Sequence, residues 1–120
     1  MIYPITPIPK PRMTRSDKWR KRPAVVRYFE YCNEIRRLGV TLPECGAKIT
    51  FCLPMPESWS KKKRLLMNRQ PHQQKPDLDN LIKALCDAIH EEDQHIWQYE
   101  ARKLWAENGS ISIDAATKVR

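Results

Sequence analysis

The sequence predicts an α+β fold, with a small mixed or antiparallel sheet, two main helices and a C-terminal β-hairpin. Two segments carry apolar residues at helical spacing, and several others alternate apolar with polar side chains. An Asn-Gly pair near the C-terminus is a strong hairpin signal. No repeat or linker interrupts the 120 residues, which are too few for a second independent core, so we expect one domain over 1–120.

The first part of the chain is expected to form an edge strand, an arm and a helix. Residues 2–8 alternate apolar side chains with prolines, which cannot donate to a central ladder. Residues 10–22 lack apolar periodicity and are predicted to be a loop. Pro23 suits the first turn of a helix that stops at Gly39. Its apolar face is predicted to consist of Val25 or Val26, Phe29, Cys32 and Ile35.

A strand and a short helix are predicted next. Residues 47–53 alternate Ile49, Phe51 and Leu53 with other side chains, and prolines end the strand. Ser58 or Ser60 is placed to cap a basic helix that reaches about Asn68. The polar, proline-containing segment that follows is predicted to be a loop.

The last part of the chain is predicted to contain a helix from Asn80 to His90 and then the hairpin. The apolar stripe of this helix comprises Leu81, Leu85 and Ile89, with Leu78 reaching the same side. Alternation from Trp97 to Trp105 predicts one strand. Asn108-Gly109 then leads into a second strand that contains Ile111 and Ile113.

Basic residues outnumber acidic ones by 22 to 14, and the net charge of +8 suits a polyanionic partner. From charge alone, the basic clusters are either solvated faces or DNA-binding surfaces. Trp19 and Trp59 lie beside them and favour nucleic acid slightly, because an indole can stack on an exposed base. The candidate DNA-binding residues are Lys10, Arg12, Arg15, Arg20, Lys21, Arg22, Lys61, Lys62, Lys63, Arg64 and Lys75.

Several functional classes are disfavoured. The cysteines show no C-x-x-C spacing, which argues against a zinc ribbon or a redox pair and favours reduced core thiols. The histidines, His72, His90 and His95, fit no H-E-x-x-H motif and are expected at the surface. No run approaches the roughly 18 apolar residues that span a bilayer, so we expect a soluble intracellular protein without membrane contact.

The stretch KPDLDNLIKALCDAI places Asp77 and Asp79 one residue apart in this basic chain. In a structural interpretation, Asp79 caps the helix while Lys83 forms surface ion pairs with Asp79 and Asp87. In a functional one, residues 75–79 are extended, both carboxylates point the same way, and a cation lies between them. Spacing alone does not choose between the two.

The cation in the functional interpretation would be Mg²⁺, which prefers one or two carboxylates together with water and substrate phosphate. Asp93 would supply a third carboxylate, and Asn80 a neutral oxygen or a supporting hydrogen bond. Lys83 would face the scissile phosphate and stabilise charge in the transition state.

These residues resemble the core of the RusA family of Holliday junction resolvases, which are often encoded by phages or prophages. The core pattern, D-x-D-N-x-x-K followed by an acidic pair before a strand, is matched by KPDLDNLIKALCDAI and EEDQHI. The segments PIPKPR, PMPESWSKKKR and PHQQKPDLDN also resemble the family, so the similarity covers most of the chain.

The resemblance implies a RusA-like fold and a cytoplasmic homodimer, in a bacterium or a phage-infected cell, that resolves four-way DNA junctions by paired symmetric nicks. It implies Mg²⁺, with Mn²⁺ as a possible substitute. Asp77, Asp79 and Asp93 would bind the metal and act in catalysis, with Lys83 as the catalytic lysine and Asn80 in support.

Here the turn before the acidic pair is shorter than is common in the family, which leaves the third ligand open among Glu91, Glu92 and Asp93. Asp93 is our choice because QHI follows it as the next strand begins. Two rivals remain. A PD-(D/E)-x-K nuclease is disfavoured because Leu81 stands where that motif needs an acid, and a non-catalytic basic DNA-binding protein would leave a four-way junction intact when Mg²⁺ is added.

Overall fold

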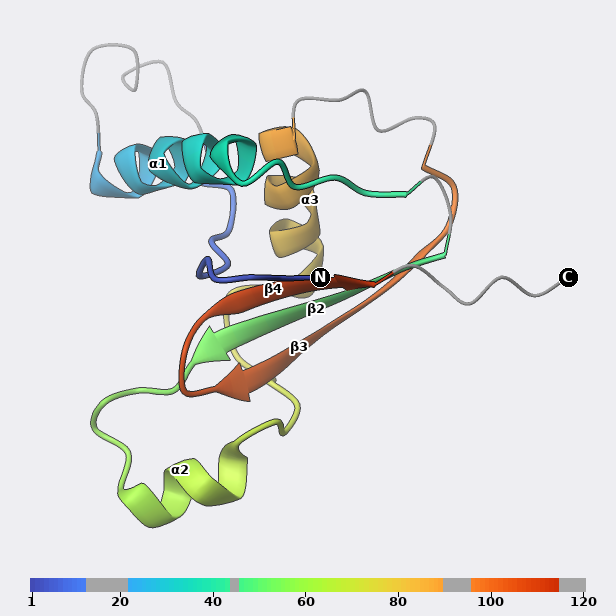
Figure 1. The fold of residues 1–120 in the computed structure, drawn as a ribbon. Helices are drawn as coiled ribbons and strands as arrows, with labels where there is room; N and C mark the ends of the chain where they lie inside the picture. Colours follow the sequence, from blue (N-terminus) through green and yellow to red (C-terminus); the bar gives the residue numbers. More distant parts are fainter. Residues whose placement is uncertain (13–21, 44–45, 90–95, 115–120) are drawn as a thin grey trace, which may run out of the picture.

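The computed structural model describes residues 1–12, 22–43, 46–89 and 96–114 (Figure 1). Within these residues it confirms the α+β class and the mixed sheet. The elements in chain order are β1 (Ile2–Tyr3), α1 (Pro23–Arg37), β2 (Ala47–Pro54), α2 (Lys61–Met67), α3 (Leu78–Ile89), β3 (Tyr99–Ala106) and β4 (Ser110–Asp114). Each helix of the described residues is too short or too polar to cross a membrane.

The sheet has the strand order β1-β4-β2-β3. β2 pairs in parallel with β3 and antiparallel with β4, while β1 pairs with β4 at one edge. The predicted edge strand is therefore confirmed, although it is shorter than 2–8. Pro4 ends it early, because proline lacks the N–H that the ladder needs.

The C-terminal strands follow the predicted order, strand, turn and strand, but they do not pair with each other. β2 lies between β3 and β4, so the turn at Asn108-Gly109 passes the end of β2 and the tight pairing expected of a type I′ hairpin does not form. The physical reason is burial. Residues 49–53 of β2 are all buried, and a strand covered on both faces gains most at the centre of the sheet.

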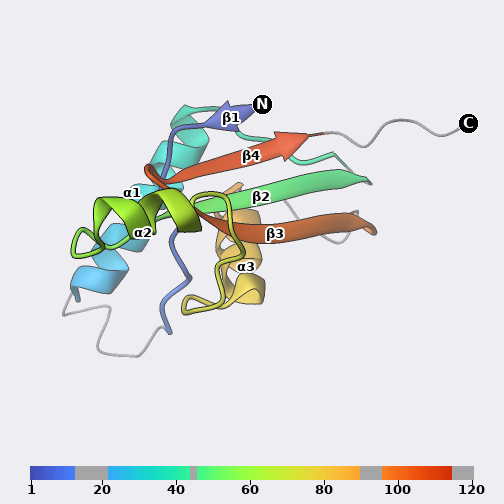
Figure 2. The same cartoon turned by 90° about the horizontal axis from the view of Figure 1, so that it is seen from below.

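Helices α1 and α3 cover one face of the sheet (Figures 1 and 2). The core between them contains Ile35, Ile49, Phe51 and Ile111, all almost completely buried. Phe29 was expected on the buried face of α1 but is 52% exposed. The buried row instead comprises Val25, Tyr28, Tyr31, Cys32 and Ile35, which recur at helical spacing and leave position 29 turned towards solvent.

Gly39 ends α1 as the sequence predicts. It has φ +66°, a left-handed conformation that glycine adopts without a steric penalty. The Gly39 N–H donates to the Arg36 carbonyl at 3.1 Å and the Val40 N–H to the Ile35 carbonyl at 3.2 Å, which together form a Schellman motif. Val40 is buried beside Ile35, so the helix end is closed by apolar contact as well as by hydrogen bonds.

Helix α2 lies apart from α1 and α3, at the far end of the sheet (Figure 1). The Ser60 hydroxyl accepts a hydrogen bond from the Lys63 N–H at 3.2 Å, so the predicted Ser cap is confirmed at Ser60. The chain after α2 returns along the outer edge of β3. There the Arg69 N–H donates to the Trp105 carbonyl at 2.8 Å and the His72 N–H to the Lys103 carbonyl at 3.0 Å.

His72 is 5% exposed, so its predicted surface position is wrong; His90 and His95 lie outside the described residues. The ring centroids of His72 and Trp105 lie 4.0 Å apart, and contact with the apolar indole shields the imidazole from water. Its buried Nδ1 has no hydrogen-bond partner among the described residues. Burial, and secondly the neighbouring Lys103 ammonium, lower the pKa of His72 below its usual 6.5.

We predict that His72 makes stability depend on pH. Because its folded pKa is lowered, the unfolded chain binds a proton first as the pH falls, so the free energy of unfolding decreases from about pH 6.5 down to the folded pKa and is then constant. His72→Phe, which keeps an aromatic ring against Trp105, should flatten this slope in urea titrations between pH 7.5 and 5. An unchanged slope would contradict the assignment.

Candidate active site

The acidic motif lies at the N-terminal turn of α3. The helix begins at Leu78, where the Leu81 N–H donates to the Asp77 carbonyl at 3.1 Å. Asp77 therefore directly precedes the helix, and Asp79 lies within its first turn. The predicted cap at Asp79 is wrong, and so is the extended conformation of 75–79, because the helix starts two residues earlier than predicted and packs Leu78 against the core.

Asp77 and Asp79 are both exposed, but they open onto different hollows. One hollow is lined by Pro9, Lys75, Pro76, Asp77 and Asn80. A second is lined by Asp79, Ile82, Lys83, Cys86, Ile96 and Tyr99, and a third by Lys10, Pro11, Arg12, Asn80 and Lys83. Shared lining residues join the three, so they surround the start of α3 as one irregular surface.

Lys83 lines two of these hollows, one that also contains Asp79 and one that is basic. It lies one turn after Asp79 on the helix, which brings both to the same hollow. The ion pairs that the structural interpretation expected are absent within the described part of the chain: Asp87 instead accepts from the Lys10 ammonium at 2.6 Å. Among the described residues the Lys83 ammonium has no ion-pair partner, so it is available to bind a ligand.

Asn80 holds the N-terminal segment against α3. Its side-chain amide donates to the Lys10 carbonyl at 3.3 Å, and the Lys10–Asp87 ion pair fixes the same segment about two helical turns further along. Arg12 follows Lys10 and lines a hollow with Lys83. The role predicted for Asn80 was support of a ligand. Its backbone N–H donates to the Asp79 carboxylate at 2.9 Å, while its side chain positions the basic segment.

Lys103 is a residue of this site that sequence reasoning missed. It lies on β3, and its ammonium donates to the Pro76 carbonyl at 2.7 Å and to the Gln74 carbonyl. These carbonyls belong to the bend at 74–76 that delivers Asp77. The sequence offers one signal for Lys103. In the alternating strand, it is a charged residue at a position of the same face as Ala101 and Trp105.

The donor set suits a hard divalent cation. Asp77 and Asp79 supply carboxylate oxygens at the start of α3, where the Asp79 carboxylate also accepts a hydrogen bond from the Asn80 N–H at 2.9 Å. Within the described residues, no three metal-binding side chains come together. Glu91, Glu92 and Asp93, the candidates for the third ligand, lie outside the described residues.

The predicted DNA-binding residues divide into three described sets and a fourth that lies outside the described residues. Lys75 and Arg12 line the hollows around α3, together with Lys10, which is paired with Asp87. Arg64 is half-buried and donates to the Pro56 carbonyl at 2.6 Å, and the Arg22 guanidinium donates to the Arg12 carbonyl at 2.6 Å. Lys61, Lys62 and Lys63 are exposed on α2, while Arg15, Arg20 and Lys21 lie outside the described residues.

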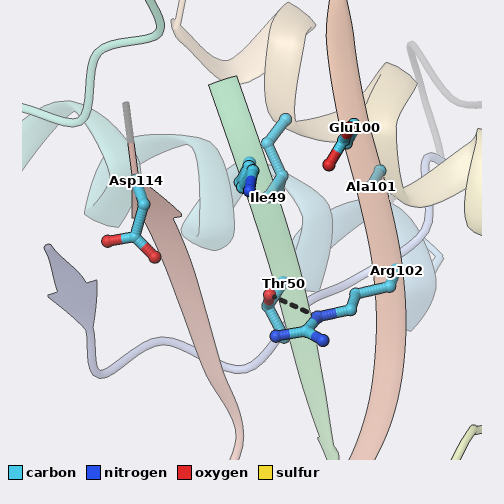
Figure 3. Close-up of a pocket in the computed structure, with 7 residues that line it drawn as sticks. Ile49, Thr50, Glu100, Ala101, Arg102 and Asp114 are labelled. Atoms are coloured by element: carbon cyan, nitrogen blue, oxygen red, sulfur yellow. Dashed lines mark hydrogen bonds between the residues drawn. The ribbon is translucent and has the colours of Figure 1, made fainter. Parts of the chain in front are cut away.

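A further hollow lies on the sheet face opposite the helices (Figure 3). The Arg102 guanidinium donates to the Thr50 hydroxyl there at 3.1 Å. Lys48, Glu100 and Asp114 complete a lining of mixed charge. This balance of opposite charges gives the hollow no preference for a polyanion, so the site at α3 remains the better candidate.

Exposed carboxylates, a lysine without an ion pair among the described residues, and basic residues around them are the components of an enzyme that acts on a phosphodiester. The comparison with known families agrees: the family Endodeoxyribonuclease RusA matches residues 3–115. The chain therefore belongs to the RusA family, endonucleases that resolve Holliday junctions by hydrolysing phosphodiester bonds in branched DNA. No curated protein and no solved structure gives a match.

We predict that Lys103 positions Asp77. Lys103→Met keeps the aliphatic stem but removes both hydrogen bonds to the 74–76 bend, so the divalent-metal concentration for half-maximal DNA cleavage should rise several-fold while DNA affinity is unchanged. Lys103→Arg, which retains the donors, should restore most of the loss. If Lys103→Met only lowers the melting temperature and leaves the metal dependence unaltered, the lysine is merely structural.

Proposed function

We propose that this protein is a Mg²⁺-dependent, structure-selective endonuclease that resolves four-way DNA junctions by paired symmetric nicks. The observation that carries the proposal is the placement of Asp77, Asp79 and Lys83 around one helix N-terminus in a chain of this family. We also infer that residues 1–120 form a single RusA-like endonuclease domain that acts in the cytoplasm of a bacterium or of a phage-infected cell.

Asp77 and Asp79 would hold the metal with a third acid, for which Asp93 is our choice. Support comes from Ile96, which lines the same hollow as Asp79 and Lys83. Asp93 precedes Ile96 by three residues, a length of chain that spans at most about 11 Å. Mg²⁺, or Mn²⁺ in its place, would lower the pKa of a water molecule and neutralise charge on the leaving oxygen.

The residues of the chain then have separate tasks. Lys83 contacts the scissile phosphate and stabilises the charge that develops in the transition state. The positive end of the α3 dipole favours the negative charge of the same phosphate. Asn80 keeps the segment that carries Lys10 and Arg12 beside the hollow, where Arg12 contacts the DNA backbone.

We predict that Asp77→Asn, and separately Asp79→Asn, abolishes cleavage of a labelled four-way junction and leaves junction binding intact or tighter. Each change removes a metal ligand and also a negative charge that opposes phosphate. Wild-type cleavage rates in either variant would refute the assignment. Asp114→Asn, an exposed acid on the opposite sheet face, is the matched control and should cleave normally.

The same assay separates the main alternative, a non-catalytic basic DNA-binding protein whose acids serve only stability and solubility. A protein of that kind would bind the junction and leave every strand intact with Mg²⁺ or Mn²⁺. Linear duplex of the same sequence, tested in parallel, distinguishes a junction-selective enzyme from a general nuclease.

We further propose that the active form is a homodimer. A four-way junction has approximate two-fold symmetry, so an isologous dimer supplies two matched sites. Large apolar side chains remain at the surface for such an interface: Trp97 is 73% exposed and Phe29 52%. Trp105, by contrast, is buried, so only part of the tryptophan content is available for contact between subunits.

We predict that sedimentation at micromolar concentration gives about twice the chain mass of 14.2 kDa. A mixed dimer with one Asp77→Asn subunit should nick one strand, because each subunit contributes one site. Full resolution of junctions by a monomer would rule out the dimer. The control is a dimer with Asp77→Asn in both subunits, which should cut neither strand.

A further inference from the structure

Helix α2 exposes two adjacent leucines. Leu65 is 74% exposed and Leu66 is 66% exposed, and no residue of α2 is buried. Exposed apolar residues are common singly, but two large ones side by side on a short helix indicate a contact surface. Figure 1 shows α2 at the end of the sheet, apart from α1 and α3.

The leucines alternate with lysines around the exposed face of the helix. Successive residues are about 100° apart, so the order around the helix is Lys61, Leu65, Lys62, Leu66. The opposite side carries the half-buried Arg64 and Met67. The exposed face is therefore both cationic and apolar.

Helix α2 is attached to the body of the protein by contacts on its other sides. Trp59 packs against Trp105 with ring centroids 4.7 Å apart, and the Lys63 ammonium lies 4.3 Å from the Trp59 ring. On the other side of the helix, Arg64 donates to the Pro56 carbonyl at 2.6 Å and pairs with Glu107 at 3.3 Å. The leucines are thus presented on an anchored helix.

The charge pattern selects the partner. A second copy of the chain, packed by two-fold symmetry on this face, would bring lysines against lysines and is disfavoured. An anionic partner that also offers flat apolar surface fits both kinds of side chain. Branched DNA has this chemistry, because bases at a branch point lose stacking partners while their phosphates remain close by.

We propose that Leu65 and Leu66 form an apolar wedge that contacts unstacked bases at the branch point, with Lys61 and Lys62 on the adjacent phosphates. This inference rests on the proposed junction substrate and adds the element that recognises the branch point. In linear duplex the same contact requires unstacking of a base step, which costs free energy. The wedge therefore favours junctions over duplex.

The test compares Leu65→Ser/Leu66→Ser with wild type, without metal, on junctions that carry 2-aminopurine at the branch point. Wild-type protein should change the 2-aminopurine fluorescence on binding, and the double variant should not. The preference for junction over duplex should fall by about tenfold or more, since burial of two leucines is lost. Ile2→Ser, at another exposed apolar residue, should change neither reading.

Lys61→Gln/Lys62→Gln provides the complementary arm. It should weaken junction and duplex binding alike and reduce the slope of log affinity against log salt by roughly 0.9 per lost phosphate contact. Circular dichroism checks that α2 remains folded in each variant, which is expected because the altered side chains are exposed.

The wedge is refuted if the leucine double variant keeps both its fluorescence change and its junction preference. It is also refuted if that variant loses only dimerisation, or only binding to anionic lipid vesicles. Because binding is measured without metal, failure of the wedge is distinguishable from failure of the proposed nuclease, which is read from cleavage by the wild-type protein.

Discussion

The packing of α3 against the sheet is the contact on which the rest of the site depends. Leu81, Ala84, Leu85 and Ala88 are completely buried and fix the rotation of the helix about its axis. Two small residues in this stripe let α3 approach its neighbours closely. Once the stripe is buried, the opposite face must carry Asp79 and Lys83 to the surface, one helical turn apart. The site is therefore positioned by core packing and needs no rigid loop of its own, except at Asp77.

Asp77 is the exception because it precedes the helix and is held from another element. The Lys103 ammonium donates from β3 to the carbonyls of Gln74 and Pro76. This cation therefore stabilises the backbone of the bend and does not contact DNA. Lys10 and Arg64 are likewise engaged, with Asp87 and Glu107. Counting basic residues thus overestimates the surface available to phosphate, and the exposed lysines of α2 become more important.

What the sequence could predict depended on how local each signal was. Gly39 and Ser60 act through hydrogen bonds within one turn, and the ends that they predict are confirmed. Neither the place of β2 between β3 and β4 nor the burial of His72 against Trp105 is local, because each is decided by pairing between distant segments. The hairpin signal at Asn108-Gly109 was outweighed by the gain from burying β2.

The candidate site shows the same division. The D-x-D-N-x-x-K pattern located the residues around the start of α3, whereas their conformation was misjudged because helix formation extends to Leu78. Lys103 was missed because nothing in its neighbourhood along the chain relates it to residues 74–76. The third acid lies outside the described residues, so its identity among Glu91, Glu92 and Asp93 stays a prediction.

The strand β3 connects the two surfaces that would contact DNA. Trp105 packs against Trp59, which directly precedes the cap of α2 in the chain. Lys103, two residues before Trp105 on the same face of the strand, holds the bend before Asp77. Residues 69–72 run between them along the edge of β3 and cover its backbone groups there. A wedge on α2 and a cleavage site at α3 would therefore share one rigid support. Such a support sets a constant separation between the branch point that is bound and the phosphate that is cut, which is what selectivity for a branched substrate requires.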